Sequence, residues 1–135
     1  MKKLFASLAI LCAFVCIVSC SSGASPKAIA EQYAEFVKQG DYTGVVNLLY
    51  IQSTGDATQD KEQKEVLIDM FNQNIKPEIE AKGGVKSYSI SKIIMDEDKE
   101  SAITYVDFIF NNGTLNKQKC DLVKVDNKWY LTFKK

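Results

Sequence analysis

Apolar residues gather in four short runs in the C-terminal third of the chain, between Val85 and Phe133. Three turn-forming stretches separate these runs: the charged residues 96–99, Asn111-Asn112-Gly113 and Asp126-Asn127. An Asn-Gly pair between two such runs is the strongest short-range signal of a β-hairpin. The pattern therefore predicts a four-stranded antiparallel meander at this end of the chain.

The second run, at 102–110, is apolar on both faces of a β-strand. An antiparallel strand with one wet face should alternate cleanly, so both faces of this strand are expected to be covered. Helices can cover one face, and a ligand or a partner, most simply a second copy of the chain, can cover the other. The alternative is a strongly bent sheet that wraps its own helix. The candidate ligand or partner face comprises Ile103, Tyr105, Asp107 and Ile109.

The third predicted strand, at about 115–125, departs from strict alternation. Leu122 and Val123 are adjacent apolar residues, and a β-bulge would explain the slip. In the last strand, Trp129, Leu131 and Phe133 are expected to face inward.

Helical spacing of apolar residues predicts three helices before the sheet. The first starts at Ser25-Pro26 and ends at Gly40, and the second follows Asp41 as its N-cap. The third begins near 58–60, and Pro77 should stop or kink it. Its predicted buried face is Val66, Leu67, Met70, Phe71 and Ile75. The predicted fold class is α+β, with three N-terminal helices packed on a curved four-stranded antiparallel meander.

The first 20 residues predict a secretory signal. A basic start, Met1-Lys2-Lys3, precedes an apolar run of about 15 residues, which is shorter than a membrane-spanning helix. The run ends in Ile17-Val18-Ser19-Cys20, which resembles the lipobox of bacterial lipoproteins. The predicted organisation is a signal peptide at 1–19, a lipidated Cys20 with a flexible tether at 20–25, and one domain at 26–135. The alternative for the first segment is a buried or anchoring helix.

The lipobox resemblance implies that lipid on Cys20 anchors the protein to a membrane. Residues 21–25 form a short Ser- and Gly-containing tether with no acidic cluster, and no Asp follows the Cys. These features favour a Gram-negative cell envelope and an outer-membrane lipoprotein that faces the periplasm. Cys12 and Cys16 would leave with the signal, so Cys120 would have no internal disulfide partner and is expected to be a small core residue.

Composition excludes several kinds of chemistry. The chain has no His and no Arg, which removes the usual near-neutral base and the bidentate clamp for phosphate. Its net charge is formally zero, so no basic field recruits nucleic acid. The acidic residues around 96–100 are expected to form a solvated turn and not a metal site. We therefore expect no nucleic-acid partner, metal or cofactor.

Two local stretches carry a resemblance to a known family. Gln39-Gly40-Asp41-Tyr42 is similar to the junction between the first two helices in the nuclear-transport-factor-2-like (cystatin-like) superfamily. The run from Leu122 to Trp129 is similar to the final hairpin of the same superfamily. Within it, the chain resembles small bacterial lipoproteins built on a domain of unknown function. The resemblance implies a cone in which a curved sheet wraps a helix and leaves a mouth for a small ligand. Neither stretch is a catalytic signature.

These features favour a non-catalytic, lipid-anchored binding or assembly module of the cell envelope. Its partner would be a small apolar ligand, an envelope protein or a second copy of the chain that meets it through the sheet. One alternative is a His-free isomerase or hydrolase that uses Asp107 with a Tyr, which requires Asp107 and Tyr105 to point into a cavity. Another is an inhibitor or immunity protein. The aromatic residues of the helical part are assigned to the core, unless one of Tyr33, Tyr42 or Tyr50 lines a pocket.

Overall fold

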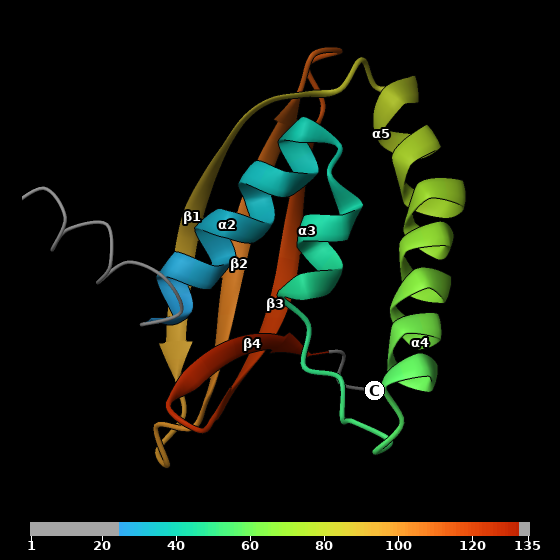
Figure 1. Ribbon diagram of the computed structural model, residues 1–135. Helices are drawn as coiled ribbons and strands as arrows, with labels where there is room; N and C mark the ends of the chain where they lie inside the picture. Colours follow the sequence, from blue (N-terminus) through green and yellow to red (C-terminus); the bar gives the residue numbers. More distant parts are fainter. Residues whose placement is uncertain (1–24, 133–135) are drawn as a thin grey trace, which may run out of the picture.

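A computed structural model describes residues 25–132 as an α+β fold (Figure 1). The helical elements are α2 (Pro26–Gln39), α3 (Tyr42–Asn47), α4 (Ala57–Met70), the π-helical turn η1 (Phe71–Ile75) and α5 (Lys76–Ala81). The strands are β1 (Val85–Met95), β2 (Ser101–Phe110), β3 (Leu115–Val125) and β4 (Lys128–Thr132). The predicted signal segment, Cys20 and Phe133 lie outside the described residues. No helix within residues 25–132 is long and apolar enough to cross a membrane.

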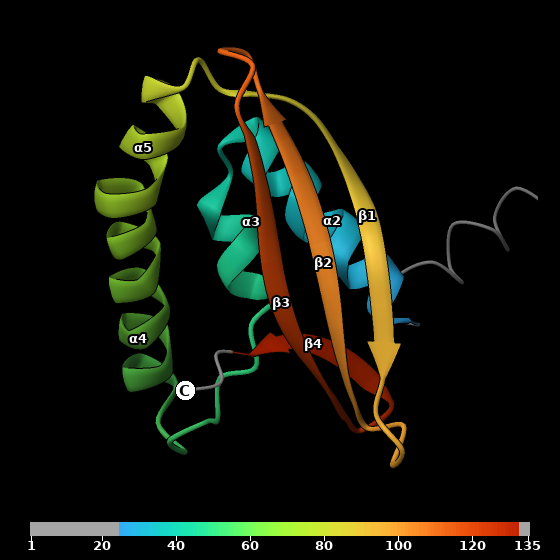
Figure 2. The ribbon, with the colours of Figure 1, turned by 180° about the vertical axis from the view of Figure 1, so that it is seen from behind.

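The four strands form the predicted antiparallel meander, in the order β1-β2-β3-β4. Both α2 and α3 lie on one face of this sheet, which we call the inner face (Figure 1). Seen from behind, the outer face of β1, β2 and β3 has no helix across it (Figure 2). The free edge of β4 is joined to the segment after α3, because Leu131 donates to Leu48 and Tyr50 donates to Leu131, both at 2.8 Å.

The predicted starts of the first two helices are confirmed at atomic detail. The Ser25 side chain accepts a hydrogen bond from the Ala28 N–H at 3.1 Å, directly before Pro26. The Asp41 carboxylate accepts one from the Gly44 N–H at 3.0 Å. Gly40 ends α2 with a φ of 74°, a left-handed conformation that glycine adopts without steric cost.

The third predicted helix does not stop at Pro77, the first of the two expected effects of that proline, but continues past it through an irregular turn. It begins after Asp56, whose carboxylate accepts from the Thr58 N–H at 2.9 Å, and runs through α4, η1 and α5 as one helical rod at 57–81. The wider π-helical turn lies just before Pro77, which then occupies the first turn of α5. A proline is tolerated there because the first turn needs no N–H donor.

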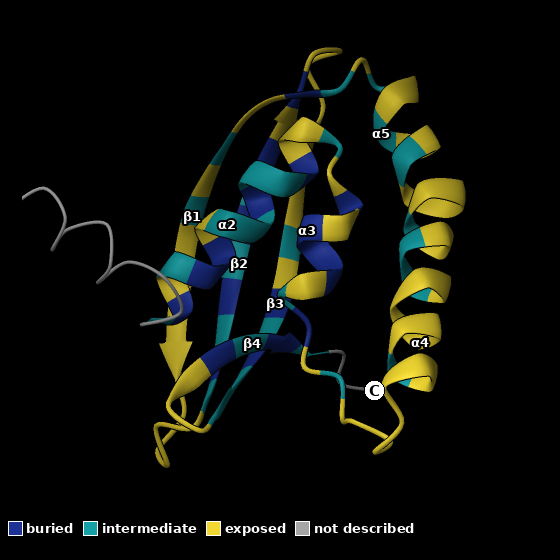
Figure 3. Ribbon diagram, in the orientation of Figure 1, coloured by how far each residue is buried: buried dark blue, intermediate teal, exposed yellow. Residues whose placement is uncertain are grey.

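The predicted buried face of this helix is wrong. No residue of α4 is buried, and the exposed fractions of Val66 and Met70 are 66% and 45%. Leu67 and Phe71 are partly buried against the core. Figure 3 shows the contrast: α2, α3 and the inner side of the sheet carry the buried positions, whereas the rod is mostly exposed. The core therefore forms between α2, α3 and the sheet, and the rod stands at its side.

The predicted bulge in β3 is also wrong. β3 pairs without interruption with β2 from Leu115 to Val123, and with β4 from Asp121 onward. Leu122 is fully buried on the inner face and its neighbour Val123 lies on the outer face, so both apolar residues fit a regular strand. The irregularities occur in β1, where the register shifts between Val85 and Ser87 and between Ile90 and Lys92.

Candidate functional site

The predicted ligand or partner face lies on the outer side of β2. Ile103, Tyr105, Asp107 and Ile109 alternate there with residues of the buried inner face, and Ile109 is 41% exposed. The Asp107 carboxylate accepts a hydrogen bond from Ser91 Oγ at 3.2 Å, and its oxygen lies 3.9 Å from the Lys117 ammonium nitrogen. Tyr105 is flanked in register by Lys92 and Lys119. This outer face has no helix across it and carries both apolar and charged side chains.

The same geometry bears on the enzyme alternative, which needs Asp107 and Tyr105 inside a cavity. Both side chains lie on the face opposite the helices, and neither lines the cavities between the helices and the sheet. The pair does not form an internal acid–base site.

An inner cleft separates the rod and α3 from the inner face of β2 and β3. It contains two cavities, of about 120 Å³ and about 230 Å³, which share Tyr33, Phe71 and Gln118 in their walls. The smaller cavity extends along the rod to Ile75 and Ile79. The larger opens toward β3 and β4. Its remaining walls come from Val45, Leu49, Lys119, Cys120, Asp121, Leu131 and Thr132.

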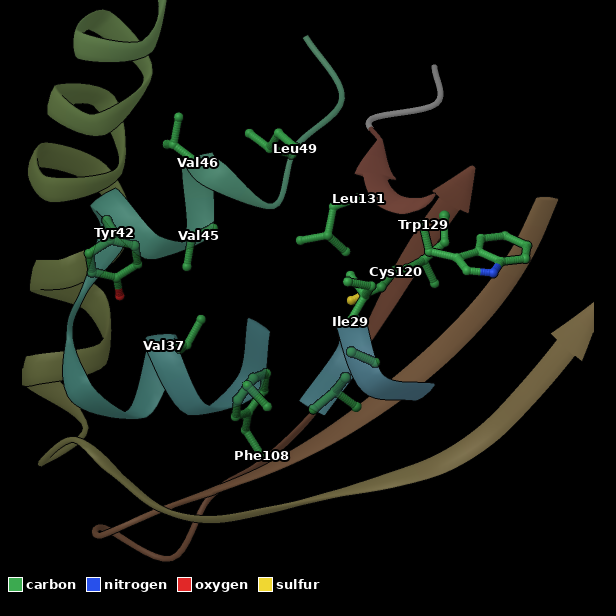
Figure 4. Close-up of a cluster of buried hydrophobic side chains, with 14 of the residues drawn as sticks. Ile29, Val37, Tyr42, Val45, Val46, Leu49, Phe108, Cys120, Trp129 and Leu131 are labelled. Atoms are coloured by element: carbon green, nitrogen blue, oxygen red, sulfur yellow. The ribbon is translucent and has the colours of Figure 1, made fainter. Parts of the chain in front are cut away.

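Two tyrosines give the cleft its polar groups. Tyr42, on α3, is buried, and its ring stacks on Phe71 with ring centres 5.8 Å apart and planes 7° from parallel. Figure 4 shows the Tyr42 ring between α3 and the rod. Its hydroxyl has no hydrogen-bond partner within residues 25–132. Tyr33 lies edge-on to Phe108 at 6.2 Å. Burial raises the pKa of both phenols, chiefly through desolvation, so both stay neutral at physiological pH.

Of the three tyrosines weighed from the sequence, Tyr33 and Tyr42 line the cleft and Tyr50 does not. Tyr50 is 42% exposed, and its ring meets that of Tyr130 at 5.8 Å. Gln118 and Cys120 were missed as cleft residues. The alternating pattern of β3 indicates that even-numbered residues share one face, but the expected bulge obscured it, and the strand register shows that this face is the inner one.

Cys120 is a buried thiol in the wall of the larger cavity. Burial raises its pKa to about 12, an effect that the hydroxyl of its cross-strand neighbour Thr104 offsets in part. That hydroxyl falls short of hydrogen-bond geometry, which is consistent with sulfur being a weak partner. A neutral buried thiol is a poor nucleophile, so Cys120 acts here as an apolar wall, in agreement with the core role expected from the sequence.

Charged residues also line the cleft: Glu78 and Lys82 in the smaller cavity, Lys119 and Asp121 in the larger. The Lys82 ammonium sits 4.8 Å above the Phe110 ring, and Glu78 lies on the neighbouring turn of α5. Within residues 25–132, no group of three or more His, Cys, Asp or Glu side chains could hold a metal ion. The cleft therefore combines apolar contact with neutral phenols and a few charged or amide side chains.

Comparison with known proteins defines the class. The chain belongs to the family described as "Domain of unknown function (DUF4878)", whose family model matches residues 18–132. The fold is nuclear-transport-factor-2-like: the crystal structure of an NTF2-like transpeptidase from Campylobacter jejuni superposes with a TM-score of 0.66, covering 82% of this chain and 99% of that one at 21% identity. The predicted superfamily is thus confirmed at the level of fold.

A SEC-C motif containing protein from Rhodopseudomonas palustris is a more remote match, with a TM-score of 0.49 and 12% identity over 87% of this chain and 82% of that one. No curated protein sequence matches the chain.

Proposed function

We propose that this protein is a non-catalytic binding module of the Gram-negative cell envelope, tethered by lipid on Cys20 to the periplasmic side of the outer membrane. The lipobox-like Ile17-Val18-Ser19-Cys20 and the short tether before α2 support the anchor. The observation that carries the binding role is the inner cleft, a space lined by aromatic and aliphatic side chains with polar residues among them. On the rod side it is bounded by η1 and α5, neither of which has a buried residue.

The chemistry of the cleft favours binding over catalysis. General acid–base work needs a group that titrates near the working pH. Tyr33, Tyr42 and Cys120 all have their pKa raised, away from neutrality, by burial. The unpaired Tyr42 hydroxyl is costly to bury and can donate to an acceptor on a bound molecule, so occupancy of the cleft would relieve that cost.

The anchor is tested by expressing the full chain and a Cys20→Ser variant in a Gram-negative host with radiolabelled palmitate. We expect the label only on the wild-type chain, which should fractionate with outer membranes. Absence of label on the wild type, while a known lipoprotein in the same cells is labelled, would refute the anchor.

The cleft is tested with the neutral fluorescent dye N-phenyl-1-naphthylamine. Gln118 lines both cavities, so a Gln118→Trp variant should fill the shared space and weaken dye binding by about tenfold or more. The matched control is Gln52→Trp, which places the same indole on an exposed loop residue. Equal dye affinity in both variants would show that the dye binds elsewhere and would count against the cleft.

A further inference from the structure

β3 has an open edge next to the cleft. β4 pairs with β3 only from Asp121 to Val125, so the first half of β3 has a paired strand on its β2 side alone. The direction of its backbone groups follows from two hydrogen bonds. The Lys124 N–H donates to the Glu100 carbonyl at 2.7 Å, and the Phe110 N–H donates to the Thr114 carbonyl at 2.9 Å.

Because backbone groups alternate along a strand, even-numbered β3 residues point their N–H and C=O groups toward β2. Lys117 and Lys119 then point theirs to the open edge. The Lys119 carbonyl accepts from the Gln118 side-chain amide at 3.1 Å, which fits this orientation. By this register the Lys119 N–H and both backbone groups of Lys117 point away from β2, β4 does not reach them, and none takes part in the turn, loop or cap hydrogen bonds of residues 25–132. This short edge is therefore ready to pair with another strand.

The rod forms the opposite wall of this opening. Phe71, at the start of η1, lines the larger cavity together with Gln118, Lys119 and Cys120 of β3. On α4, Met70 directly precedes Phe71 and Val66 lies between one and two turns earlier, and both are exposed. Figures 1 and 2 show the rod beyond the β3 edge of the sheet, with α3 but no strand in the space between them.

We propose that an extended peptide segment of a partner protein adds to the β3 edge as a further strand, between β3 and the rod. This deepens the proposed binding role and rests on it. The added strand would continue the row of hydrogen bonds that β4 makes with Asp121 and the residues after it. A peptide fits better than an acyl chain, because a lipid would cover the apolar wall and leave the edge N–H groups unpaired.

The register specifies the side chains of this peptide. Residues opposite Lys117 and Lys119 lie on the outer face beside the two lysine side chains, both exposed, so acidic residues complement them. The residues between these positions point inward, toward the apolar wall at Phe71, Cys120 and Leu131. The partner segment therefore alternates acidic and apolar side chains. It must displace the Gln118 amide from the Lys119 carbonyl.

The probe is a fluorescein-labelled peptide, Gly-Glu-Val-Glu-Val-Glu-Gly, added to the full chain in mild detergent and followed by fluorescence anisotropy. The control peptide, Gly-Glu-Glu-Glu-Val-Val-Gly, has the same composition without alternation. We expect binding of the alternating peptide in the range of about 1 mM or tighter, and at least about fivefold weaker binding of the control.

Two variants at one position separate the backbone from the side chain. Lys119→Pro removes the edge N–H, which the sheet itself does not use, and should weaken peptide binding about tenfold or more. Lys119→Ala keeps the N–H and removes the charge, so binding should stay within about threefold of wild type. Gln118→Ala, which frees the Lys119 carbonyl, should bind the peptide at least as tightly as wild type.

A measurement on the unmodified chain keeps the test independent of how the proline variant folds. Amide exchange followed by NMR should slow at Lys117 and Lys119 when the alternating peptide is added. Equal binding of both peptides, equal affinity of the Pro and Ala variants, or unchanged exchange at these two amides would overturn the proposal. If the naphthylamine dye binds the wild-type chain and Gln118→Trp weakens that binding, the cleft role stands and only the added strand is rejected.

Discussion

The hydrogen bond between Tyr88 and Glu35 links β1 to α2 on the inner face of the sheet. The Tyr88 hydroxyl donates to the Glu35 carboxylate at 2.8 Å. This bond lowers the pKa of Glu35, and a hydrogen bond from the Gln39 side chain lowers it further by a smaller amount. Desolvation is the largest cause that raises the pKa of Tyr88 to about 12, and the hydrogen bond to Glu35 is the next largest. Both shifts favour the state in which the phenol is neutral and the carboxylate is charged.

The two shifts define a pH window for this bond. Its stabilisation is present above the unfolded pKa of Glu, about 4.3, and is lost as pH falls through the lower folded pKa. On the alkaline side it is present below the unfolded pKa of Tyr, about 10, and is lost as pH rises toward 12. A Tyr88→Phe variant should thus be less stable than wild type at pH 7, and the difference should shrink below pH 4 and above pH 10.

Urea unfolding at pH 3, 7 and 11 measures this difference, with Tyr50→Phe as the matched control because Tyr50 is an exposed tyrosine. A difference between wild type and Tyr88→Phe that does not vary with pH would contradict the assignment.

Thr104 is a fully buried residue whose hydroxyl lacks a hydrogen-bond partner within the described residues. A Thr104→Val variant keeps the shape and removes the buried polar atom. We expect its free energy of unfolding to rise by about 1 kcal/mol. Thr43→Val, at an exposed position of α3, is the control and should change stability little. A clear loss of stability in Thr104→Val would show that the hydroxyl has a favourable contact, with Cys120 as the candidate.

Single-residue features could be predicted from the sequence when they depend on neighbours in the chain, and could not when they depend on distant residues. The caps at Ser25 and Asp41 depend on residues three positions away, and the sequence predicts both correctly. The Tyr42 position could be weighed only as core or pocket, because the ring that stacks on it comes from Phe71, almost thirty residues later. The open N–H of Lys119 could not be predicted, because it depends on where β4 stops.

At the scale of elements, α2 and α3 approach closely through a glycine. A Cβ built on Gly44 would lie 2.6 Å from Cδ1 of Phe36, closer than real side chains come. We expect Gly44→Ala to lower the free energy of unfolding by about 1–3 kcal/mol, although alanine favours the helix. A double variant that adds Phe36→Leu should recover part of the loss. Chemical denaturation of both variants and of the exposed control Thr43→Ala tests this, and a stabilised Gly44→Ala would contradict it.

The helical rod shows why pattern alone misjudged one element. Apolar residues at helical spacing predict a buried stripe, and in α2 that stripe packs on the sheet. The same spacing in α4 predicts burial that the fold does not provide, because no element lies against Val66 and Met70. The spacing identifies which face is apolar, but not whether the chain itself supplies the surface that covers it. The strands were predicted more securely, because their turns and hairpins are local.

At the scale of the whole molecule, stability is distributed unevenly between the core and the rod. α2 buries five residues, Pro26, Ile29, Ala30, Ala34 and Val37, whereas α4 buries none. Elements with few buried apolar contacts open at a lower free energy than the molecule as a whole. The rod is also the wall that an occupant of the cleft would meet, so binding and local stability should be coupled.

We therefore expect amides 57–70 to exchange with solvent through a local opening, with protection roughly tenfold to a hundredfold below that of α2. Hydrogen exchange of the full chain, read by mass spectrometry at increasing urea, measures this: exchange in α4 should depend little on urea until global unfolding dominates. The alternating peptide should slow exchange in η1 and the adjoining α4 more than in α2, because Phe71 faces the opening from the rod whereas α2 is already held by five buried residues. Equal protection of α4 and α2 in the unbound chain would show that the rod unfolds only with the core, and would remove the coupling between its stability and the occupancy of the cleft.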